Sequence, residues 1–419
     1  MMALKRTGLA AALIILMVAG MVAATAPAGN LIIFIIDGAG ASHRQLAQLA
    51  SKQLLAMNSM PVLGMMATLN VDGAITDSAA SATAMFCGKK TYNGLLGYDD
   101  NLDELDSIME LAEKKGMLTG IITNSALYDA TSAAMYAKEF DRLAYGNLSA
   151  QLLKSGIDLL IGGGNTYLRG ALAESLKQTG TGLAANSSHS LRELKGMPLP
   201  AICVLAEGAL PIALDRPEGF VTLDDMVQAG LEKLASADRP FVLLVESGAV
   251  DRMSHDNDAA GALSEMIETE RAVKACLDFA ARDGSTLVVV TSDHETGGLS
   301  LGAGDGYKVD VKYLSSIKAS AGSMLEDAAG DWDKLGGIML RDASWDAGKD
   351  MDISHIRSSE DPVREIGIII SAKANISWGS GWHTAAPVPV SAEGPGSGAF
   401  GGWYDNTGLF LRLKSAVGL

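Results

Sequence analysis

The run Leu31-Ile-Ile-Phe-Ile-Ile36 is purely apolar and stops at a carboxylate, Asp37. A short run with no polar face is typical of a strand buried on both sides of a parallel sheet. The same arrangement recurs twice: Phe241-Val-Leu-Leu-Val245 precedes Glu246, and Leu287-Val-Val-Val290 lies shortly before Asp293 and His294. Open α/β sheets bind ligands at the carboxyl ends of their strands. The three acid-ended runs therefore predict a cluster of metal ions at the rim of a sheet.

The chain as a whole fits one large α/β domain. It has 419 residues, 48% of them hydrophobic, and its apolar runs alternate with helical patterns. We expect a doubly wound, mostly parallel sheet flanked by helices, with an inserted lobe over about 300–380, where periodicity is weak. The predicted strands are 31–36, 62–69, 119–123, 158–161, 201–205, 241–246, 286–292 and 366–371, and the predicted helices include 103–115 and 263–282.

The N-terminus has the pattern of a secretory signal peptide. Lys5 and Arg6 precede an apolar stretch over 8–24, and the small residues of Ala26-Pro-Ala28 follow. We therefore expect a signal over 1–28 and a mature catalytic domain over 29–419. The alternative is an uncleaved helix that anchors the protein to a membrane, although about 17 apolar residues is near the lower limit for a span. Either reading predicts export to the periplasm or the extracellular space.

Charge argues against nucleic-acid binding, and cysteine spacing argues against a zinc ribbon or a disulfide framework. The formal net charge is −16, and loss of Lys5 and Arg6 with the signal would make it −18. Binding to nucleic acid is not expected, because it requires a basic face. An anionic small substrate would need local positive charge, which bound metal ions could supply. The three cysteines, Cys87, Cys203 and Cys276, are far apart, so neither a zinc ribbon nor a disulfide framework is indicated.

Three of the six histidines stand in patterns that suit metal binding. Asp251 and His255 are four residues apart, which places both side chains on one face of a helix. Asp293 and His294 form a pair at a predicted strand end, and His383 follows a Gly-Ser-Gly-Trp segment in a predicted loop. Each pattern alone has an ordinary explanation, such as a surface ion pair, a turn or a structural histidine. Their convergence with further acids favours metal, since neighbouring carboxylates repel one another unless cations lie between them.

The segment Thr76-Asp-Ser-Ala-Ala-Ser-Ala-Thr-Ala84 is built almost entirely of small residues. Small side chains permit close approach of a ligand to the backbone and to a helix N-terminus, which suits an anion. Ser78 would then be an exposed nucleophile, activated by a neighbouring base or metal. The alternative is that serine and alanine merely pack a tight helix.

Five blocks of the chain resemble conserved segments of the alkaline phosphatase family. The first runs from Asp77 to Gly94 and contains Asp77-Ser-Ala-Ala-Ser-Ala-Thr-Ala84 and Gly88-Lys-Lys-Thr-Tyr-Asn-Gly94. The others are Gly162-Gly-Gly164, Glu246-Ser-Gly-Ala-Val-Asp251 with His255, Ser292-Asp-His294 and Trp382-His-Thr384. The resemblance extends from about residue 30 to residue 402. It implies a homodimeric phosphatase that uses two Zn²⁺ ions and one Mg²⁺ ion.

The resemblance also implies a role for each candidate metal ligand. The first zinc ion would be bound by Asp251, His255 and His383, and the second by Asp37, Asp293 and His294. Magnesium would be bound by Asp37 together with Glu246 and Thr131.

Four further residues match positions that handle phosphate in the family. The resemblance implies that Ser78 is phosphorylated during the reaction and that Arg142 clamps the phosphate group. Arg252 stands where the best-known bacterial members have lysine and others have histidine or tryptophan. In the family this side chain acts with the residue at Asp129 to tune phosphate binding through water.

The expected reaction is hydrolysis of small phosphate monoesters through a phosphoserine, with an alkaline pH optimum. The sequence bears on three alternatives. An arylsulfatase would need a Cys/Ser-x-Pro-x-Arg motif, which the residues after Ser78 lack. A phosphodiesterase of the same metalloenzyme superfamily remains open, as does a non-catalytic protein that binds phosphate or metal.

Overall fold

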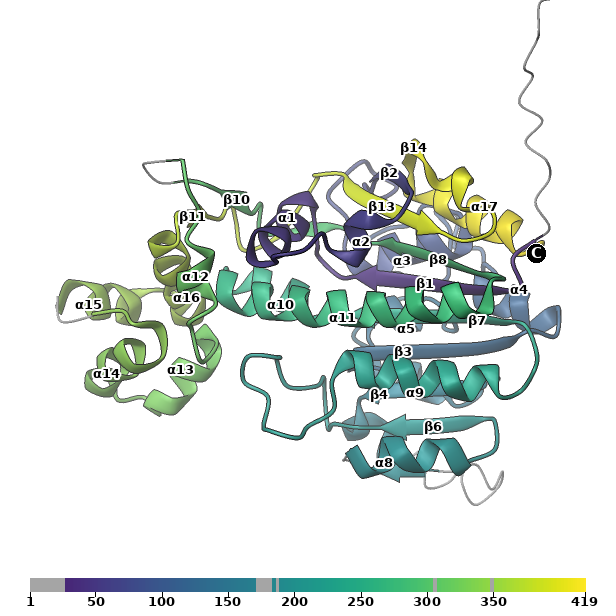
Figure 1. The fold of residues 1–419 in the computed structure, drawn as a ribbon, viewed down its shortest axis with the longest axis horizontal. Helices are drawn as coiled ribbons and strands as arrows, with labels where there is room; N and C mark the ends of the chain where they lie inside the picture. The colour runs from purple at the N-terminus through teal and green to yellow at the C-terminus, as the bar shows by residue number, and fades with distance from the viewer. Residues whose placement is uncertain (1–26, 171–182, 186–187, 304–306, 347–349) are drawn as a thin grey trace, which may run out of the picture.

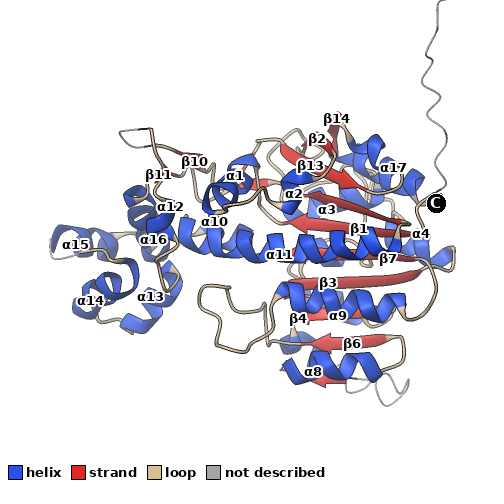
Figure 2. Ribbon diagram, in the orientation of Figure 1, coloured by secondary structure: helices blue, strands red, loops and turns tan. Residues whose placement is uncertain are grey.

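The structure is a computed structural model that describes residues 27–170, 183–185, 188–303, 307–346 and 350–419. Ten strands form one sheet in the order β14-β2-β13-β8-β1-β7-β3-β4-β6-β5 (Figures 1 and 2). β13 is antiparallel to both of its neighbours, and every other pair in this sheet is parallel. The strands are β1 (Asn30–Ile36), β2 (Val62–Ala67), β3 (Leu118–Ala126), β4 (Leu159–Gly163), β5 (Leu183–Ala185), β6 (Ala201–Val204), β7 (Phe241–Ser247), β8 (Thr286–Thr291), β13 (Val388–Glu393) and β14 (Gly402–Asp405). The predicted mostly parallel sheet is confirmed.

The three acid-ended runs are three neighbouring strands. β1 lies between β7 and β8, and Ile35 is opposite Glu246 on one side and Thr291 on the other. Just beyond β1, the Asp37 amide donates to the Ser247 carbonyl over 3.0 Å. Because the three strands are parallel and in this register, their carboxyl ends meet at one edge of the sheet.

The two faces of the sheet carry separate apolar cores. Alternate side chains of a strand point to opposite faces. In β1, the side chains of Leu31, Ile33 and Ile35 therefore pack toward α3 (Ser78–Cys87), α4 (Ile108–Lys114) and α17 (Asn406–Ala416). Those of Ile32, Phe34 and Ile36 pack toward α9 (Leu223–Ala235) and α11 (Ala259–Asp283). Figure 1 shows α9 and α11 lying along the sheet on the same face. The helices and 3₁₀ turns around the sheet are α1 (Ala41–Ala50), α2 (Ala56–Ser59), α3 (Ser78–Cys87), α4 (Ile108–Lys114), α5 (Ala130–Ala133), α6 (Tyr145–Leu152), α8 (Ser188–Glu193), η1 (Leu194–Gly196), α9 (Leu223–Ala235), α10 (Ala249–His255), α11 (Ala259–Asp283), η2 (Ser397–Phe400) and α17 (Asn406–Ala416).

A group of helices projects from one end of the sheet, near the start of α11 (Figure 1). It consists of α12 (Val311–Leu314), α13 (Ala321–Ala328), α14 (Trp332–Ala343), α15 (Asp350–Ser358) and α16 (Pro362–Lys373). We call residues 310–373 the lobe. Its apolar side chains, among them Met324, Leu335 and Ile366, form a third core that includes Leu263 of α11. Short antiparallel pairs lead into and out of the lobe: β10 (Ser300–Leu301) with β11 (Ile376–Ser377), and β9 (Glu295–Thr296) with β12 (His383–Thr384).

Two predicted elements differ from the structure. The predicted strand 366–371 is wrong, because these residues lie in helix α16. Asp361 caps that helix and Pro362 opens it, and Ile366 and Ile370, one turn apart, are both buried. The predicted helix 103–115 begins only at residue 108, where Ser107 and Glu110 form a capping box.

The predicted signal peptide falls almost wholly on residues 1–26, which lie outside the described residues. Within the described ranges, no helix is long and apolar enough to cross a membrane. All three cysteines are buried and free.

Candidate active site

Ser78 is the first residue of α3, the helix formed by the small-residue segment. The carboxylate of Asp77 caps this helix by accepting from the Ala80 amide over 2.9 Å. One turn on, Ser81 Oγ donates to the carbonyl of Asp293 over 2.7 Å, which ties the helix to the end of β8. As a result, the Ser78 hydroxyl lies 3.2 Å from Nε2 of His294. The small side chains thus serve both packing and the placement of Ser78.

Three imidazoles present the same nitrogen to the site. His255 Nδ1 lies 2.8 Å from the Gly381 carbonyl, and His383 Nδ1 lies 2.8 Å from the Thr76 carbonyl. A carbonyl can only accept, so Nδ1 donates a hydrogen in both rings and Nε2 is the nitrogen that faces the other candidate ligands. His294 Nδ1 lies 3.2 Å from Thr296 Oγ1. Metal-binding histidines are typically oriented in this way by an oxygen on the second ring nitrogen.

The predicted trio Asp251, His255 and His383 is brought together. Nε2 of His255 lies 3.3 Å from Asp251 Oδ2 and 3.2 Å from His383 Nε2. Nε2 of His383 lies 3.7 Å from Asp251 Oδ1. Burial by itself would raise the pKa of Asp251, but its hydrogen bond to His255 and the charge of His294 hold that pKa well below the ordinary value. The carboxylate is therefore ionised and ready to bind a cation.

The second predicted trio, Asp37, Asp293 and His294, is also brought together. Nε2 of His294 lies 3.1 Å from Asp293 Oδ2 and 3.6 Å from Asp37 Oδ1. The ligand atoms of the three side chains lie within 4.8 Å of one another, as do those of Asp251, His294 and His383. The rings of His294 and His383 are stacked at 3.5 Å, so the two trios adjoin. We call these six residues the ligand cluster: Asp37, Asp251, His255, Asp293, His294 and His383.

Glu246 lies in β7 and Thr131 lies in α5. Glu246 is buried and accepts from Ser132 Oγ over 2.9 Å. Burial, with the charge of Asp129, raises the pKa of Glu246 to about 7, against hydrogen bonds from Thr123 and Ser132. The Asp37 carboxyl has its pKa raised well above the ordinary value by burial and then by Asp293, Asp251 and Glu246. The acids thus lie close together at a cost in electrostatic free energy, which bound cations would remove.

Several polar atoms of the site are buried without a hydrogen-bond partner. They are Asp37 Oδ1, Asp293 Oδ2 and Thr131 Oγ1. A buried polar atom without a partner costs free energy, most of all on a carboxylate. All three belong to the predicted ligand sets, so the residues present fit bound metal ions.

Arg142 is held by two carboxylates, one of which belongs to Asp77, the residue before Ser78. One of its terminal nitrogens lies 3.2 Å from Asp77 Oδ2 and the other 3.6 Å from Asp129 Oδ1. The same oxygen of Asp77 accepts from the Gly94 amide over 2.9 Å. Burial by itself lowers the pKa of Arg142, but Asp129 and Asp77 outweigh it and raise the pKa. The guanidinium therefore stays charged beside Asp77, which precedes the candidate nucleophile in the chain.

Arg252, on α10 beside Asp251, is turned elsewhere. Its guanidinium donates to the Leu210 carbonyl over 3.4 Å, and its Nε is buried without a partner. Within the described parts of the chain, Asp129 is paired with Arg142 and no contact joins it to Arg252.

No motif in the sequence points to Thr296, yet it links the two trios. Its hydroxyl donates to Asp251 Oδ1 and also lies 3.2 Å from His294 Nδ1. β9 and β12 place Thr296 opposite His383. This pairing joins segments 87 positions apart in the chain, so no local pattern could reveal it.

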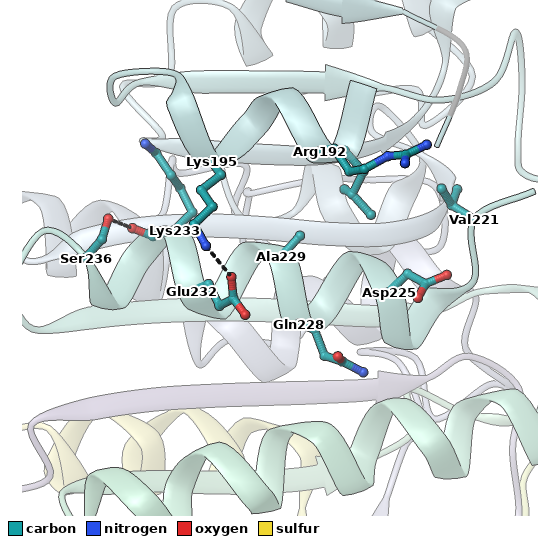
Figure 3. A pocket seen from close by; sticks show the side chains of 10 residues that line it. Arg192, Lys195, Val221, Asp225, Gln228, Ala229, Glu232, Lys233 and Ser236 are labelled. Atoms are coloured by element: carbon teal, nitrogen blue, oxygen red, sulfur yellow. Dashed lines mark hydrogen bonds and ion pairs between the residues drawn. The ribbon is translucent and has the colours of Figure 1, made fainter. Parts of the chain in front are cut away.

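A cavity of about 560 Å³ lies against α9, next to α8 and η1 (Figure 3). Its lining includes Arg192, Lys195, Val221 and Lys233. None of its lining residues belongs to the ligand cluster or touches Ser78. The cavity is therefore separate from the candidate active site.

A serine hydroxyl beside imidazoles and carboxylates, at the carboxyl edge of a parallel sheet, defines a metal-binding hydrolase. The chain belongs to the alkaline phosphatase family, whose family model matches residues 28–419. It is therefore a phosphatase that hydrolyses phosphate monoesters.

Known proteins agree in sequence and in structure. The chain is 31% identical over 416 residues to alkaline phosphatase 3 of Bacillus subtilis, covering 93% of this chain and 88% of the relative. It is 27% identical to the alkaline phosphatase of Escherichia coli over 94% of this chain and 87% of the relative. Among solved structures, the cold-active alkaline phosphatase of a Shewanella species superposes with a TM-score of 0.84 at 30% identity, covering 93% of this chain and 99% of that chain. The Thermus thermophilus alkaline phosphatase superposes with a TM-score of 0.87 at 26% identity, covering 94% of this chain and 92% of that chain.

Proposed function

We propose that Ser78 is the nucleophile that receives the phosphoryl group from a monoester. The observation that carries this proposal is the position of its hydroxyl, 3.2 Å from Nε2 of His294 at the N-terminus of α3. That position puts the hydroxyl against the ligand cluster, while the preceding residue, Asp77, holds Arg142. Nucleophile, cation-binding groups and a fixed positive charge thus converge on one point.

The proposed reaction has two displacements. In the first, a bond forms between Ser78 Oγ and phosphorus, the bond from phosphorus to the ester oxygen breaks, and the alcohol leaves. In the second, water attacks the phosphoserine and inorganic phosphate is released, which returns the hydroxyl to Ser78. Each in-line step inverts phosphorus, so the net result is retention of configuration.

The ligand sets match different metals. We propose that Asp251, His255 and His383 hold one zinc ion and that Asp37, Asp293 and His294 hold the second. Imidazole mixed with carboxylate suits zinc. The all-oxygen set of Asp37, Glu246 and Thr131 suits magnesium. When bound, these ions supply positive charge and Lewis acidity, which lower the pKa of nearby hydroxyls and stabilise the attacking and leaving oxygens.

We propose that Arg142 binds two non-bridging oxygens of the phosphoryl group. A guanidinium offers two parallel N–H groups, a geometry that matches phosphate. Asp77 and Asp129 support this role, because they restrict the rotation of the side chain. The substrate would compete with these carboxylates for the same hydrogens.

We further propose that Arg252 and Asp129 tune the affinity for phosphate through water. The support is the place of Arg252 next to Asp251, although its guanidinium bonds to Leu210. Replacement Arg252→Lys should change the inhibition constant of inorganic phosphate. An unchanged inhibition constant would show that Arg252 has no part in phosphate binding.

Trapping the covalent intermediate tests the central proposal. The metal-loaded protein would be mixed with a monoester and quenched in acid, and its peptides analysed by mass spectrometry. We expect one phosphoryl group on Ser78. Turnover of the ester with no phosphorylated Ser78 peptide would contradict the assignment.

We propose that the mature chain is exported and forms a homodimer. Leu63 of β2 and Trp403 of β14 support a self-association surface, because they are 66% and 67% exposed at the edge of the sheet. Sedimentation of the mature chain would test the dimer. Analysis of cell fractions and of the N-terminal residue would test export and cleavage.

A further inference from the structure

Trp382 is a large aromatic residue left exposed beside the ligand cluster. Its side chain is 72% exposed. The centroid of its ring lies 6.2 Å from that of His255, and the two planes meet at 83°. The indole therefore contacts a candidate metal ligand while most of its surface stays open to a ligand that binds beside the cluster.

The backbone around Trp382 is held in place. The Gly381 carbonyl binds the imidazole of His255, and the Trp382 carbonyl accepts from the Gly297 amide over 2.9 Å. The Trp382 amide donates to Ser380 Oγ over 3.1 Å. The ring is therefore carried by a segment that also orients a metal ligand.

The lobe contacts the same segment through α16. Trp378 Nε1 donates to Ser371 Oγ of α16 over 3.1 Å, and Asn257, which lies outside the lobe between α10 and α11, donates to the Ser380 carbonyl over 2.8 Å. A Cβ at Gly381 would lie 2.4 Å from a guanidinium nitrogen of Arg364, also in α16. We call 378–382 the Trp382 strap. Its contacts with α16 connect the lobe to the segment that carries Trp382.

A row of contacts sets the order of these groups. Ser78 Oγ contacts His294, the ring of His294 stacks on that of His383, and His383 Nε2 lies 3.2 Å from His255 Nε2. Trp382 follows His255. Ser78 and Trp382 are thus at opposite ends of the row.

We propose that Trp382 is a specificity-determining residue that binds the leaving group of the ester and favours aromatic leaving groups. This inference rests on the proposed function of Ser78. In an in-line displacement the leaving oxygen departs on the side of phosphorus opposite the nucleophile. In the proposed site the trio of Asp251, His255 and His383 holds the ion on the side of the leaving oxygen, and Trp382 lies against His255. An aromatic leaving group can stack on the open part of the indole, whereas a short alkyl group has little surface to offer.

Two monoesters test the proposal: 1-naphthyl phosphate and ethyl phosphate, each measured as kcat/KM at the same pH and metal content. The ratio of the two values removes any general effect on folding or metal loading. For Trp382→Ala we expect the ratio to fall by about five-fold relative to the unaltered protein, as for the loss of one aromatic pair. Trp382→Phe should keep most of the ratio. Inhibition by inorganic phosphate, which has no leaving group, should not change.

Tyr307→Ala is the matched control, because Tyr307 is a fully exposed aromatic residue and, within the described ranges, no contact joins it to the ligand cluster. Its ratio should equal that of the unaltered protein. An unchanged ratio in Trp382→Ala, whether both kcat/KM values stay the same or fall equally, would overturn the inference while leaving Ser78 as the nucleophile. Failure of the proposed function would appear differently, as turnover without phosphorylation of Ser78.

Discussion

The hydroxyl of Ser78 lies 3.2 Å from Nε2 of His294, although 216 positions separate the two residues in the chain. Ser78 opens a helix and His294 follows a central strand, so only the packing of α3 against the end of β8 brings them together. The Ser81 hydrogen bond to the Asp293 carbonyl maintains this packing. The contact joins the candidate nucleophile to the ligand cluster.

Ser78→Ala should abolish the chemistry and preserve the fold. The missing atom is one hydroxyl oxygen, and loss of a covalent nucleophile lowers kcat by about 10³-fold or more. Steady-state kinetics with a monoester would measure this. Metal content and melting temperature should stay at their original values. Ser236→Ala, at the exposed end of α9, is the control and should retain full activity.

Removal of metal should inactivate and destabilise the protein. Without metal, the buried carboxylates of Asp37 and Asp293 would lie close to one another and to further acids, with ligand atoms within 4.8 Å. A ligand present at 100 times its Kd stabilises the folded state by about 2.7 kcal/mol. Calorimetry before and after chelation should therefore show a lower melting temperature, restored by zinc and magnesium. An apo protein with unchanged melting and activity would contradict the metal sites.

Asp37→Asn should stabilise the metal-free protein at pH 8 while removing activity from the metal-loaded protein. Burial and neighbouring acids raise the pKa of Asp37 in the folded state, so ionisation opposes folding. This penalty is absent below the unfolded pKa and is complete above the raised folded pKa. The variant should thus gain in melting temperature at pH 8 but not at pH 3. A loss of stability at pH 8 would count against like-charge crowding.

Arg142→Ala should weaken binding of substrate and of inorganic phosphate. Hydrogen bonds to a charged group contribute about 1.5–3 kcal/mol, so KM and the inhibition constant should rise by about 10-fold to 100-fold. Arg142→Lys keeps the charge without the paired N–H groups. Its KM and inhibition constant should lie between those of the unaltered protein and those of Arg142→Ala. Equal behaviour of the lysine variant and the unaltered protein would argue against two-point binding.

Thr296→Val should reduce zinc affinity, because it removes the hydroxyl that contacts both Asp251 and His294 at nearly constant volume. Loss of such a supporting contact typically lowers metal affinity or activity by about 10-fold to 100-fold. Competition with a chromogenic chelator would measure the affinity. Thr296→Ser should recover most of it. If serine and valine behaved alike, the hydroxyl would have no such role.

Glu113→Gln provides a test of stability away from the site. Burial raises the pKa of Glu113 to about 7, opposed by the Thr119 hydrogen bond and aided by Glu110. Because the folded pKa is raised, charge on Glu113 opposes folding progressively between pH 4.5 and about 7. Glutamine should gain about 1 kcal/mol at pH 8, after allowance for solvent screening, and nothing at pH 4. Glu218→Gln, at an exposed position, should show no such pH-dependent gain.

Local patterns were sufficient for most of the sheet and insufficient for part of the lobe. The apolar runs of β1, β7 and β8 are all buried strands, as predicted. The run 366–371 has the same apolar character but lies in α16, because short apolar runs do not distinguish a strand from a buried helix. The cap at Asp361 and the proline after it decide the matter.

The sequence by itself determined the parallel sheet, the acids at its strand ends and, through the family resemblance, the residues that the structure brings together around Ser78. The sheet and its acids follow from side-chain type and spacing within single segments, whereas the site residues follow from the resemblance. The tertiary structure alone decided which carbonyl orients each histidine, that Thr296 joins both trios, and that Arg252 turns to Leu210. His383, for example, bonds to a carbonyl 307 positions away. Such contacts depend on strand order and helix packing, which local patterns do not contain.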